Sequence, residues 1–195
     1  MRSTLHNRFG RFFLLLAVII FLPAFAFGES EDGNILQNGS FELLDGDGLP
    51  ENWFTDSYVQ EPGYTVFSVR DTEGGRGRVA EIHNIGENDA RFGQVIPVEP
   101  DTLYRLSGYI LADGVEGGHG ANLSIEGVYA FSRKCYDTGG EWEYIEYYGE
   151  TGPDQEYLTV FARLGGYSGE STGTAAFDAI TPTRVDRVQI GRAHV

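Results

Sequence analysis

Near its two ends the chain reads Asn34-Ile-Leu-Gln-Asn-Gly-Ser-Phe-Glu42 and Gly173-Thr-Ala-Ala-Phe-Asp-Ala-Ile180. Each stretch is a short apolar pattern of the strand type, in which a carboxylate follows an aromatic residue. If the first and last strands of one β-sandwich lie side by side, Glu42 and Asp178 meet at the seam between them. Two carboxylates at close range repel each other unless a cation lies between them. We therefore expect a domain that closes on itself, with a hard cation bound by oxygen ligands, Ca²⁺ foremost, at this seam.

Short runs of alternating or β-branched residues recur between these two stretches, separated by breaks rich in Gly, Asp and Glu. The runs are Tyr64–Val69, Arg78–His83, Phe92–Val98, Leu103–Ile110, Ala121–Glu126, Glu143–Tyr148 and Tyr157–Leu164. With the two terminal stretches they give about nine strands, and no segment shows a convincing helical period. Regular short strands joined by turn residues predict an all-β sandwich or barrel.

Three of these runs place polar and aromatic side chains on the side that faces away from the core. Alternation directs Tyr144 and Tyr148 outward in one run, Glu126 in a second and Arg163 in a third. Tyr supplies a flat face and a hydroxyl group, while Arg and Glu form paired hydrogen bonds with sugar diols. These side chains are therefore a candidate carbohydrate-binding face, which Tyr167 in the following Gly-rich loop would cover at one end. An ordinary wetted sheet surface is the alternative.

Composition narrows the possible partners and activities. The 195-residue chain has a formal charge of −15 at pH 7 and a single cysteine, Cys135. So acidic a protein is a poor partner for nucleic acid or an anionic membrane surface, whereas neutral ligands and cations remain possible. No intrachain disulfide can form. The sequence has no Ser-His-Asp order, phosphate-binding loop or His/Cys metal cluster, so we do not expect this chain to be an enzyme.

Both ends are expected to lie outside the folded domain. Residues 1–28 combine a positively charged start with an apolar run from Phe12 to Phe27, which is typical of a cleavable export signal; a retained anchor is the alternative. Ile190-Gly-Arg-Ala-His-Val195 matches the translation of a common short-read sequencing adapter, so residues 189–195 are interpreted as adapter read-through rather than as a native tail. We therefore expect an exported protein, secreted or held at the cell surface, whose domain covers residues 29–188 and is followed by a missing downstream part.

Five short pieces follow one another in a particular order along the chain. They are Asn38-Gly-Ser-Phe-Glu42, Leu49-Pro-Glu-Asn-Trp53, the run from Gln94 to Tyr104, Gly140-Glu-Trp142 and Ala176-Phe-Asp178. In this order they resemble the carbohydrate-binding module family 4/9/16/22 type, whose members are galactose-binding-domain-like β-jelly rolls. The resemblance covers roughly residues 33–185.

The resemblance implies a non-catalytic module that binds a polysaccharide or cell-surface glycan. The missing downstream domain would then be a partner such as a glycoside hydrolase or a membrane glycosyltransferase. A structural or adhesive β-sandwich of a cell-surface protein, with no sugar site, is the alternative.

The resemblance also implies a structural Ca²⁺ site. Glu42 and Asp178 would be its carboxylate ligands, with the Ser40 carbonyl and Glu73 as further ligands. The sequence departs from the common pattern at Ala179, where a second acid often follows the Asp. In proteins of this type the positions of Trp53 and Trp142 more often pack at sheet edges than stack on sugars.

Overall fold

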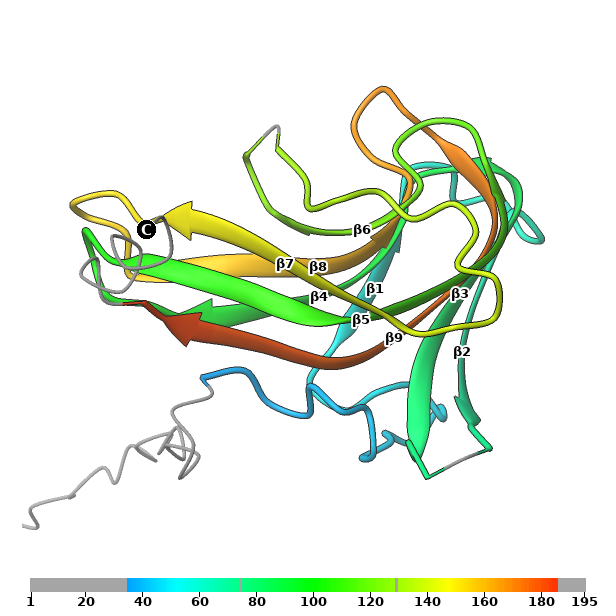
Figure 1. The fold of residues 1–195 in the computed structure, drawn as a ribbon, viewed down its shortest axis with the longest axis horizontal. Coiled ribbons are helices and arrows are strands. Elements are labelled where there is room, and N and C mark those ends of the chain that lie inside the picture. The colour runs from blue at the N-terminus through cyan, green and yellow to red at the C-terminus, as the bar shows by residue number, and fades with distance from the viewer. Residues whose placement is uncertain (1–34, 74, 129, 186–195) are drawn as a thin grey trace, which may run out of the picture.

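The computed structural model describes residues 35–73, 75–128 and 130–185, which form two antiparallel sheets packed face to face (Figure 1). The strands are β1 (Phe54–Ser57), β2 (Thr65–Asp71), β3 (Arg78–Asn88), β4 (Ala90–Pro97), β5 (Leu103–Glu116), β6 (Ala121–Ile125), β7 (Glu143–Glu150), β8 (Tyr157–Leu164) and β9 (Ser171–Arg184). No helix is present in these residues. The predicted all-β sandwich of about nine antiparallel strands is confirmed.

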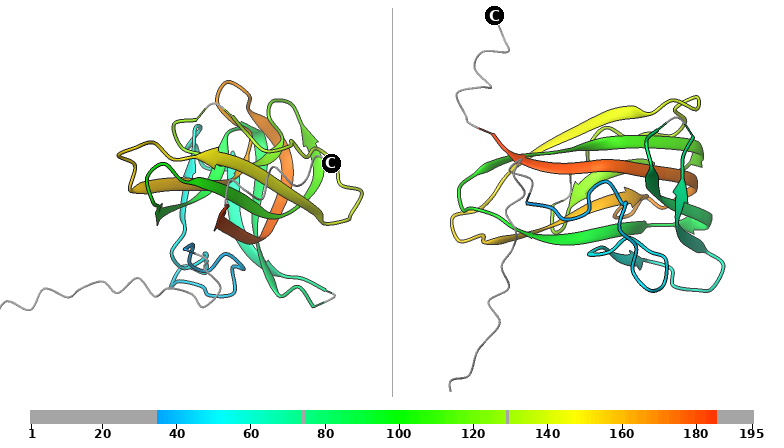
Figure 2. Two further views of the ribbon diagram at one scale, coloured as in Figure 1. Left: turned by 60° about the vertical axis from the view of Figure 1, so that its left-hand side comes forward. Right: turned by 90° about the horizontal axis from the view of Figure 1, so that it is seen from below.

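The strands are divided between a four-stranded sheet, in the order β1-β4-β8-β6, and a five-stranded sheet, in the order β2-β3-β9-β5-β7. The right-hand view of Figure 2 shows the sandwich from its side, with β7, β5 and β9 in one layer and β8 and β4 in the other. Neighbouring elements in sequence thus often lie in different layers, and most of the pairing is between segments far apart in the chain.

Alternation along the strands fills the space between the layers. Ile82, Phe92, Ile110, Leu123 and Phe177 point inward from both sheets, and each is fully buried. Burying a side chain of this size stabilises the fold by about 1.5–3 kcal/mol. The core-facing positions of every strand are therefore fixed, and only the outward positions are available for recognition.

The N-terminal stretch is not a strand, contrary to the prediction from its apolar pattern. Asn38 and Phe41 have φ values of 51° and 58°, which a strand does not accommodate, and the segment runs as turns. The segment nevertheless lies beside the last strand, as predicted, because Ile180 of β9 donates its N–H to the Gly39 carbonyl at 2.8 Å. Phe41 of the segment is fully buried. The first strand of the sandwich is β1 instead.

Loops cover the outer side of the four-stranded sheet at one end. The segment after β6 runs along the free edge of that strand, where Ser124 pairs with Phe131 and Ala121 with Cys135. The β5–β6 and β8–β9 connections meet at the same end, since His119 donates its N–H to the Gly169 carbonyl at 3.1 Å. These loops decide which outward side chains solvent can reach.

The predictions for residues 1–28 and 189–195 concern parts of the chain outside the described residues. Among residues 35–73, 75–128 and 130–185 no helix is long and apolar enough to span a membrane.

Candidate ligand-binding face

The outer side of the four-stranded sheet carries a row of aromatic and arginine side chains, which we call the arginine face. It is formed by Phe54 of β1, Arg91 of β4, Phe161 and Arg163 of β8, and Tyr167 of the β8–β9 loop. Register places them together, because Phe54 is paired with Gly93, which is paired with Phe161, while Arg91 is paired with Arg163. All four strand residues therefore project to the side opposite the core.

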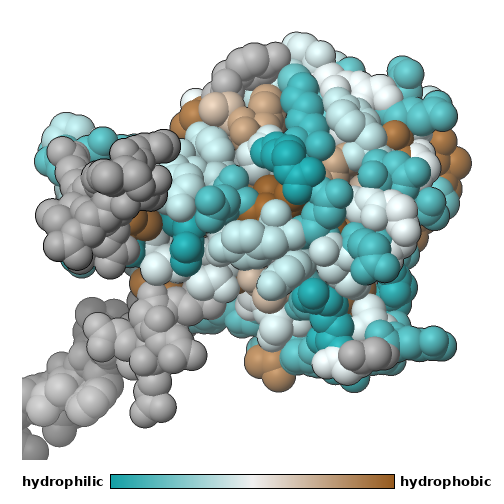
Figure 3. All heavy atoms as spheres, viewed as in Figure 1, coloured by the Kyte–Doolittle hydropathy of each residue, from teal (hydrophilic) through white to brown (hydrophobic). Residues whose placement is uncertain are grey.

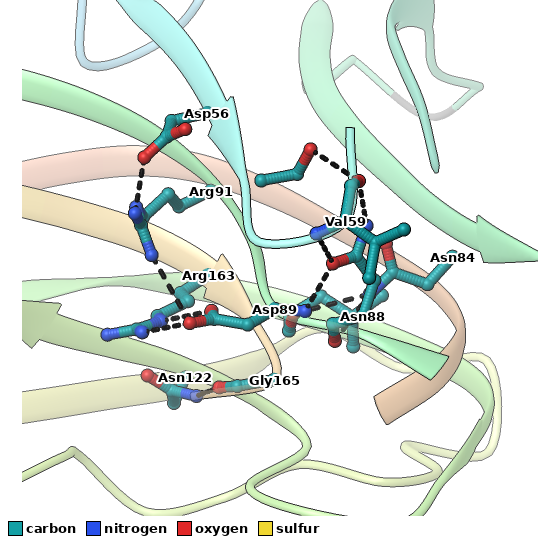
Figure 4. Close-up of polar contacts among 11 residues, drawn as sticks. Asp56, Val59, Asn84, Asn88, Asp89, Arg91, Asn122, Arg163 and Gly165 are labelled. Carbon is teal, nitrogen blue, oxygen red and sulfur yellow. Dashed lines mark hydrogen bonds and ion pairs between the residues drawn. The ribbon is translucent and has the colours of Figure 1, made fainter. Parts of the chain in front are cut away.

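Arg163 forms the buried centre of this face. Its Nε donates to Asp89 Oδ1 at 2.6 Å, and its Nη2 donates to Asp89 Oδ2, in a bidentate pair (Figure 4). Arg163 is 0% exposed and Asp89 is 4% exposed. The Tyr167 ring lies over the guanidinium, 4.5 Å from ring centroid to Cζ, in cation–π geometry. Burial makes this pair costly to break, because either partner alone would be a charge without compensation.

A second arginine extends the pair toward the solvent. Arg91 Nη1 donates to Asp89 Oδ2 at 3.2 Å, while Arg91 Nη2 donates to Asp56 Oδ2 on β1. Two arginines are thus balanced by two aspartates. The Arg91 guanidinium also lies 5.3 Å from the centroid of the Phe161 ring. The face is consequently rigid and close to neutral.

Exposed aromatic rings flank this rigid centre. Tyr167 is 38% exposed at one end, and Phe54 is 43% exposed on β1. Phe54 lies against the sheet because Gly93 beside it has no Cβ, which would otherwise collide with the ring. Phe54 also meets Phe161 edge to face, with 6.4 Å between ring centroids. A depression of about 310 Å³ adjoins it, lined by residues that include Gln37, Phe54, Gln94 and Val95.

Buried asparagines hold the loops around Arg163 in place. Asn122 of β6 donates from Nδ2 to the Gly165 carbonyl at 2.8 Å, which fixes the start of the loop that carries Tyr167 (Figure 4). Asn88 accepts from the Val59 N–H at 2.8 Å and donates to the Val59 carbonyl at 2.9 Å, which fixes the segment after β1. Each such bond to a buried carbonyl stabilises one loop conformation.

Three buried polar atoms on the outward side of β6 and β8 have no hydrogen-bond partner within the described part of the chain. They are Asn122 Oδ1, Ser124 Oγ and Arg163 Nη1. Asn122 is paired directly with Arg163 and Ser124 with Phe161, so all three atoms belong to one face of two adjacent strands. A buried polar atom without a partner costs about 1–3 kcal/mol. Because loops cover all three atoms, a ligand on the surface of the face does not reach them in this arrangement.

The predicted carbohydrate-binding residues are divided between the two sheets. Tyr144 and Tyr148 project from β7 in the five-stranded sheet, whereas Arg163 lies in the four-stranded sheet. Glu126 follows β6 and is exposed at the far end of the arginine face, where it accepts a hydrogen bond from Thr159 Oγ1 at 2.7 Å. The expectation that the tyrosines lie beside Glu126 and Arg163 is wrong, because β7 pairs with β5 and not with β8.

The expectation that Arg163 is open to solvent is also wrong. Alternation correctly placed it on the side away from the core, but the loops after β6 and β8 cover that side. Tyr167 does cover one end of the face, although it covers Arg163 itself. The sequence gives no signal for Phe54; it shows Glu87–Arg91 as a polar segment that is either a salt-bridged turn or a further source of hydrogen bonds, and Asp89 and Arg91 of this segment do form an ion pair.

The outer side of the five-stranded sheet differs in character from the arginine face. Figure 3, viewed onto β5, β7 and β9, shows a mostly hydrophilic surface with small, separate hydrophobic areas. Tyr144 and Tyr148 are 47% and 45% exposed there, and Tyr144 meets Tyr109 edge to face. Trp53 is buried against Phe41, with 5.0 Å between ring centroids, which supports the packing role expected for it.

The predicted calcium ligands already have other partners. Asp178, 4% exposed, accepts from Arg76 Nη1 at 2.8 Å, and Glu42 accepts the Arg78 N–H at 3.0 Å. Ser40 and Glu73 are exposed, and the described residues contain no group of three or more His, Cys, Asp or Glu side chains arranged to hold a metal. The side chains as arranged do not fit a carboxylate-bound cation at this seam, and the calcium prediction stays a prediction.

No known protein family matches the sequence, and no curated protein matches it. The fold, however, is similar to that of solved structures. A putative sugar binding protein from Bacteroides thetaiotaomicron has a TM-score of 0.55 at 17% identity, over 78% of this chain and 100% of that one. The module TmCBM61, solved in complex with β-1,4-galactotriose, has a TM-score of 0.50 at 15% identity, over 78% of this chain and 99% of that one.

A third similar structure is the enzymatically active domain of tailspike protein 4 from bacteriophage CBA120. Its TM-score is 0.57 at 12% identity, over 78% of this chain, which spans only 21% of that domain. Identities this low show the fold alone. The chain has the β-jelly-roll sandwich of carbohydrate-binding modules, as its sequence resemblance predicted.

Proposed function

We propose that this chain is a non-catalytic glycan-binding module of an exported protein, and that the arginine face is its binding surface. The observation that carries the proposal is the pairing of exposed aromatic rings with a rigid polar centre on one sheet face. Tyr167 and Phe54 offer flat apolar surfaces, and the ion pairs between them cannot relax without leaving a buried charge.

The polar atoms of the face suit hydroxyl-rich ligands. Asp56, whose side chain is 36% exposed, offers an acceptor and Arg91, 17% exposed, offers a donor to a sugar hydroxyl, whereas Asn122 Oδ1, Ser124 Oγ and Arg163 Nη1 are buried. Because two arginines are balanced by two aspartates in a protein of charge −15, the face favours neutral sugars over acidic ones.

Stacking on preformed rings gives weak binding, in the micromolar to millimolar range for a module of this type. A fused downstream partner, such as a glycoside hydrolase or a glycosyltransferase, would gain from the module by being held near its substrate. The proposed role of the module itself is attachment.

The test is a screen of the purified protein against neutral and acidic glycans, followed by calorimetry on the best ligand. We expect Tyr167→Ala and Phe54→Ala each to weaken the affinity roughly three- to tenfold, the size of a lost aromatic contact. Tyr144→Ala and Tyr148→Ala, exposed tyrosine changes on the opposite sheet, are the matched controls and should leave affinity unchanged.

The reverse pattern would move the binding surface to the five-stranded sheet, where the sequence alone had placed its tyrosines. Absence of binding to every glycan by a protein with a cooperative thermal transition would favour the structural or adhesive alternative. The complete burial of Arg163 is the observation that favours this alternative, because a fully buried ion pair also serves as a fold-specifying contact.

A further inference from the structure

Arg76 occupies the seam where the sequence predicted a metal. Arg76 belongs to the β2–β3 loop, and its Nη1 donates to Asp178 Oδ2 on β9 at 2.8 Å. The other carboxylate oxygen accepts the N–H of Ala179 at 2.7 Å. Both oxygens of this nearly buried carboxylate therefore have a donor.

Two aromatic rings surround the Arg76 guanidinium. Its Cζ lies 4.3 Å from the ring centroid of Tyr109 on β5 and 4.7 Å from that of Trp142, which immediately precedes β7. Tyr109 is the direct cross-strand partner of Asp178. The planar, weakly hydrated guanidinium ion is well suited to such a site, because it stacks on rings while it donates hydrogen bonds at its edge.

The first residue of β3 engages the second predicted metal ligand. Arg78 donates its N–H to Glu42 Oε1 at 3.0 Å, and its Nη1 donates to the Glu42 carbonyl at 2.7 Å. The β2–β3 loop and the start of β3 thus join the N-terminal segment to β9, which is the connection that a seam cation would provide.

We propose that the Arg76 side chain is the resident cation of this seam, and that the domain holds its N-terminal segment, β5, β7 and β9 together without calcium. The guanidinium supplies the positive charge that Asp178 needs, and Tyr109 and Trp142 keep it in place. Trp142 is accordingly a packing residue, since one face of its ring lies against Arg76 and is closed to a sugar. This inference is independent of glycan binding.

The experiment measures the melting temperature of the purified protein after treatment with a chelator and again in millimolar CaCl₂. We expect the same melting temperature in both, since a ligand that does not bind the native state cannot stabilise it. Arg76→Met, which keeps the length and removes the charge, should lower the melting temperature by roughly 4–12 °C in either buffer.

Two further variants test whether the effect comes from the Arg76–Asp178 pair or from the loss of any positive charge. Arg70→Ala breaks the 2.6 Å pair with Glu81, at the more exposed surface of the same β2–β3 hairpin, and should shift the melting temperature by no more than about 2–3 °C. Asp178→Asn combined with Arg76→Met should cost little more than Arg76→Met alone, because both changes break one interaction.

A melting temperature of the unmodified protein that falls with chelator and returns with Ca²⁺ would overturn the proposal, since a metal would then hold the seam. Additive losses in the double variant would overturn it as well, because Arg76 and Asp178 would then act separately.

Discussion

Asp89 is the residue on which the arginine face depends. It receives Arg163 through both oxygens and Arg91 through one, while its own backbone N–H donates to Asn88 Oδ1 at 2.9 Å. Its neighbour in the network, Asp56, has a side chain that is 36% exposed and pairs with Arg91 alone. Removing the Asp89 carboxylate therefore leaves a buried arginine charge without its partner, whereas removing the Asp56 carboxylate breaks only a pair that water screens.

Asp89→Asn should lower the free energy of unfolding by about 3–5 kcal/mol, because it leaves the Arg163 charge buried without its partner. Asp56→Asn, the matched control, should cost less than about 1 kcal/mol, because water screens that pair. Urea denaturation followed by Trp fluorescence measures both. Equal losses would mean that Arg163 reaches water in solution.

The reactivity of the Cys135 thiol is expected to depend on pH. Burial raises the pKa of its thiol from 9.0 to about 11; nearby Arg133 lowers this pKa, and Glu143, which accepts the thiol's hydrogen bond, raises it. At pH 8 the thiolate fraction should be roughly a hundredfold below that of an ordinary cysteine, so a thiol reagent should modify the native protein slowly and the urea-unfolded protein fast.

The sign of the accompanying stability change follows from the same shift. Below pH 9 the thiol is protonated in both states and contributes no pH dependence. As the pH rises from about 9 to 11, the unfolded state loses its proton first, so the stability conferred by the neutral thiol declines. Cys135→Ser should remove this decline, and an unchanged alkaline profile would contradict the assignment.

For single residues, the sequence predicts which side of the sheet a side chain points to, but it does not predict whether loops bury that side chain. Period-two alternation placed Arg163 on the side away from the core, because that side is set by the strand alone. Its burial depends on Phe131, from the segment after β6, and on Tyr167, from the loop that directly follows β8. The alternation within β8 does not show what either loop covers.

At the scale of elements, the β8–β9 loop begins at a position that only glycine fills. Gly165 has a φ of 101°, and a Cβ there would lie 2.5 Å from the Asn88 carbonyl oxygen. Asn122 donates to the Gly165 carbonyl from the opposite side. The loop that carries Tyr167 therefore leaves β8 along one fixed path.

Gly165→Ala should destabilise the protein by roughly 1–3 kcal/mol through backbone strain and should displace Tyr167 from Arg163. Gly152→Ala is the control, since a Cβ at Gly152 meets nothing within 4 Å and its φ lies outside the left-handed region. Thermal unfolding gives the stability, and tyrosine fluorescence quenching by iodide reports the exposure of the ring. A loss no larger than that of Gly152→Ala would contradict the strain argument.

Strands were predicted better than the segments between them. Tyr157–Leu164 is β8 to the residue, because its alternation is unbroken and a loop with turn residues lies on each side. Residues 35–42 carry the same apolar signal without forming a strand, since Leu36 and Phe41 enter the core from a segment of bends and turns in which Asn38 and Phe41 have positive φ. An apolar pattern thus predicts burial more securely than it predicts hydrogen bonding to a neighbour.

At the scale of the whole molecule, the order of the pieces predicted the sandwich, whereas the candidate site needed the topology. Which sheet receives β7 cannot be read from β7, and the tyrosines were assigned to the wrong neighbours for that reason. The seam was missed for a related reason. Arg76 lies 102 positions from Asp178 in the sequence. The positions of the carboxylates alone therefore do not indicate that an arginine held between two aromatic rings neutralises Asp178.

The place of β9 has a consequence for the order of events during synthesis. This strand is the last of the nine, yet it lies in the middle of the five-stranded sheet, between β3 and β5. A ribosome that has released residues up to 170 has produced two separate two-stranded ladders, β2 with β3 and β5 with β7, each with an open edge. Neither can join the other until β9 emerges, so this sheet stays incomplete, and open to chaperones or proteases, until β9 inserts.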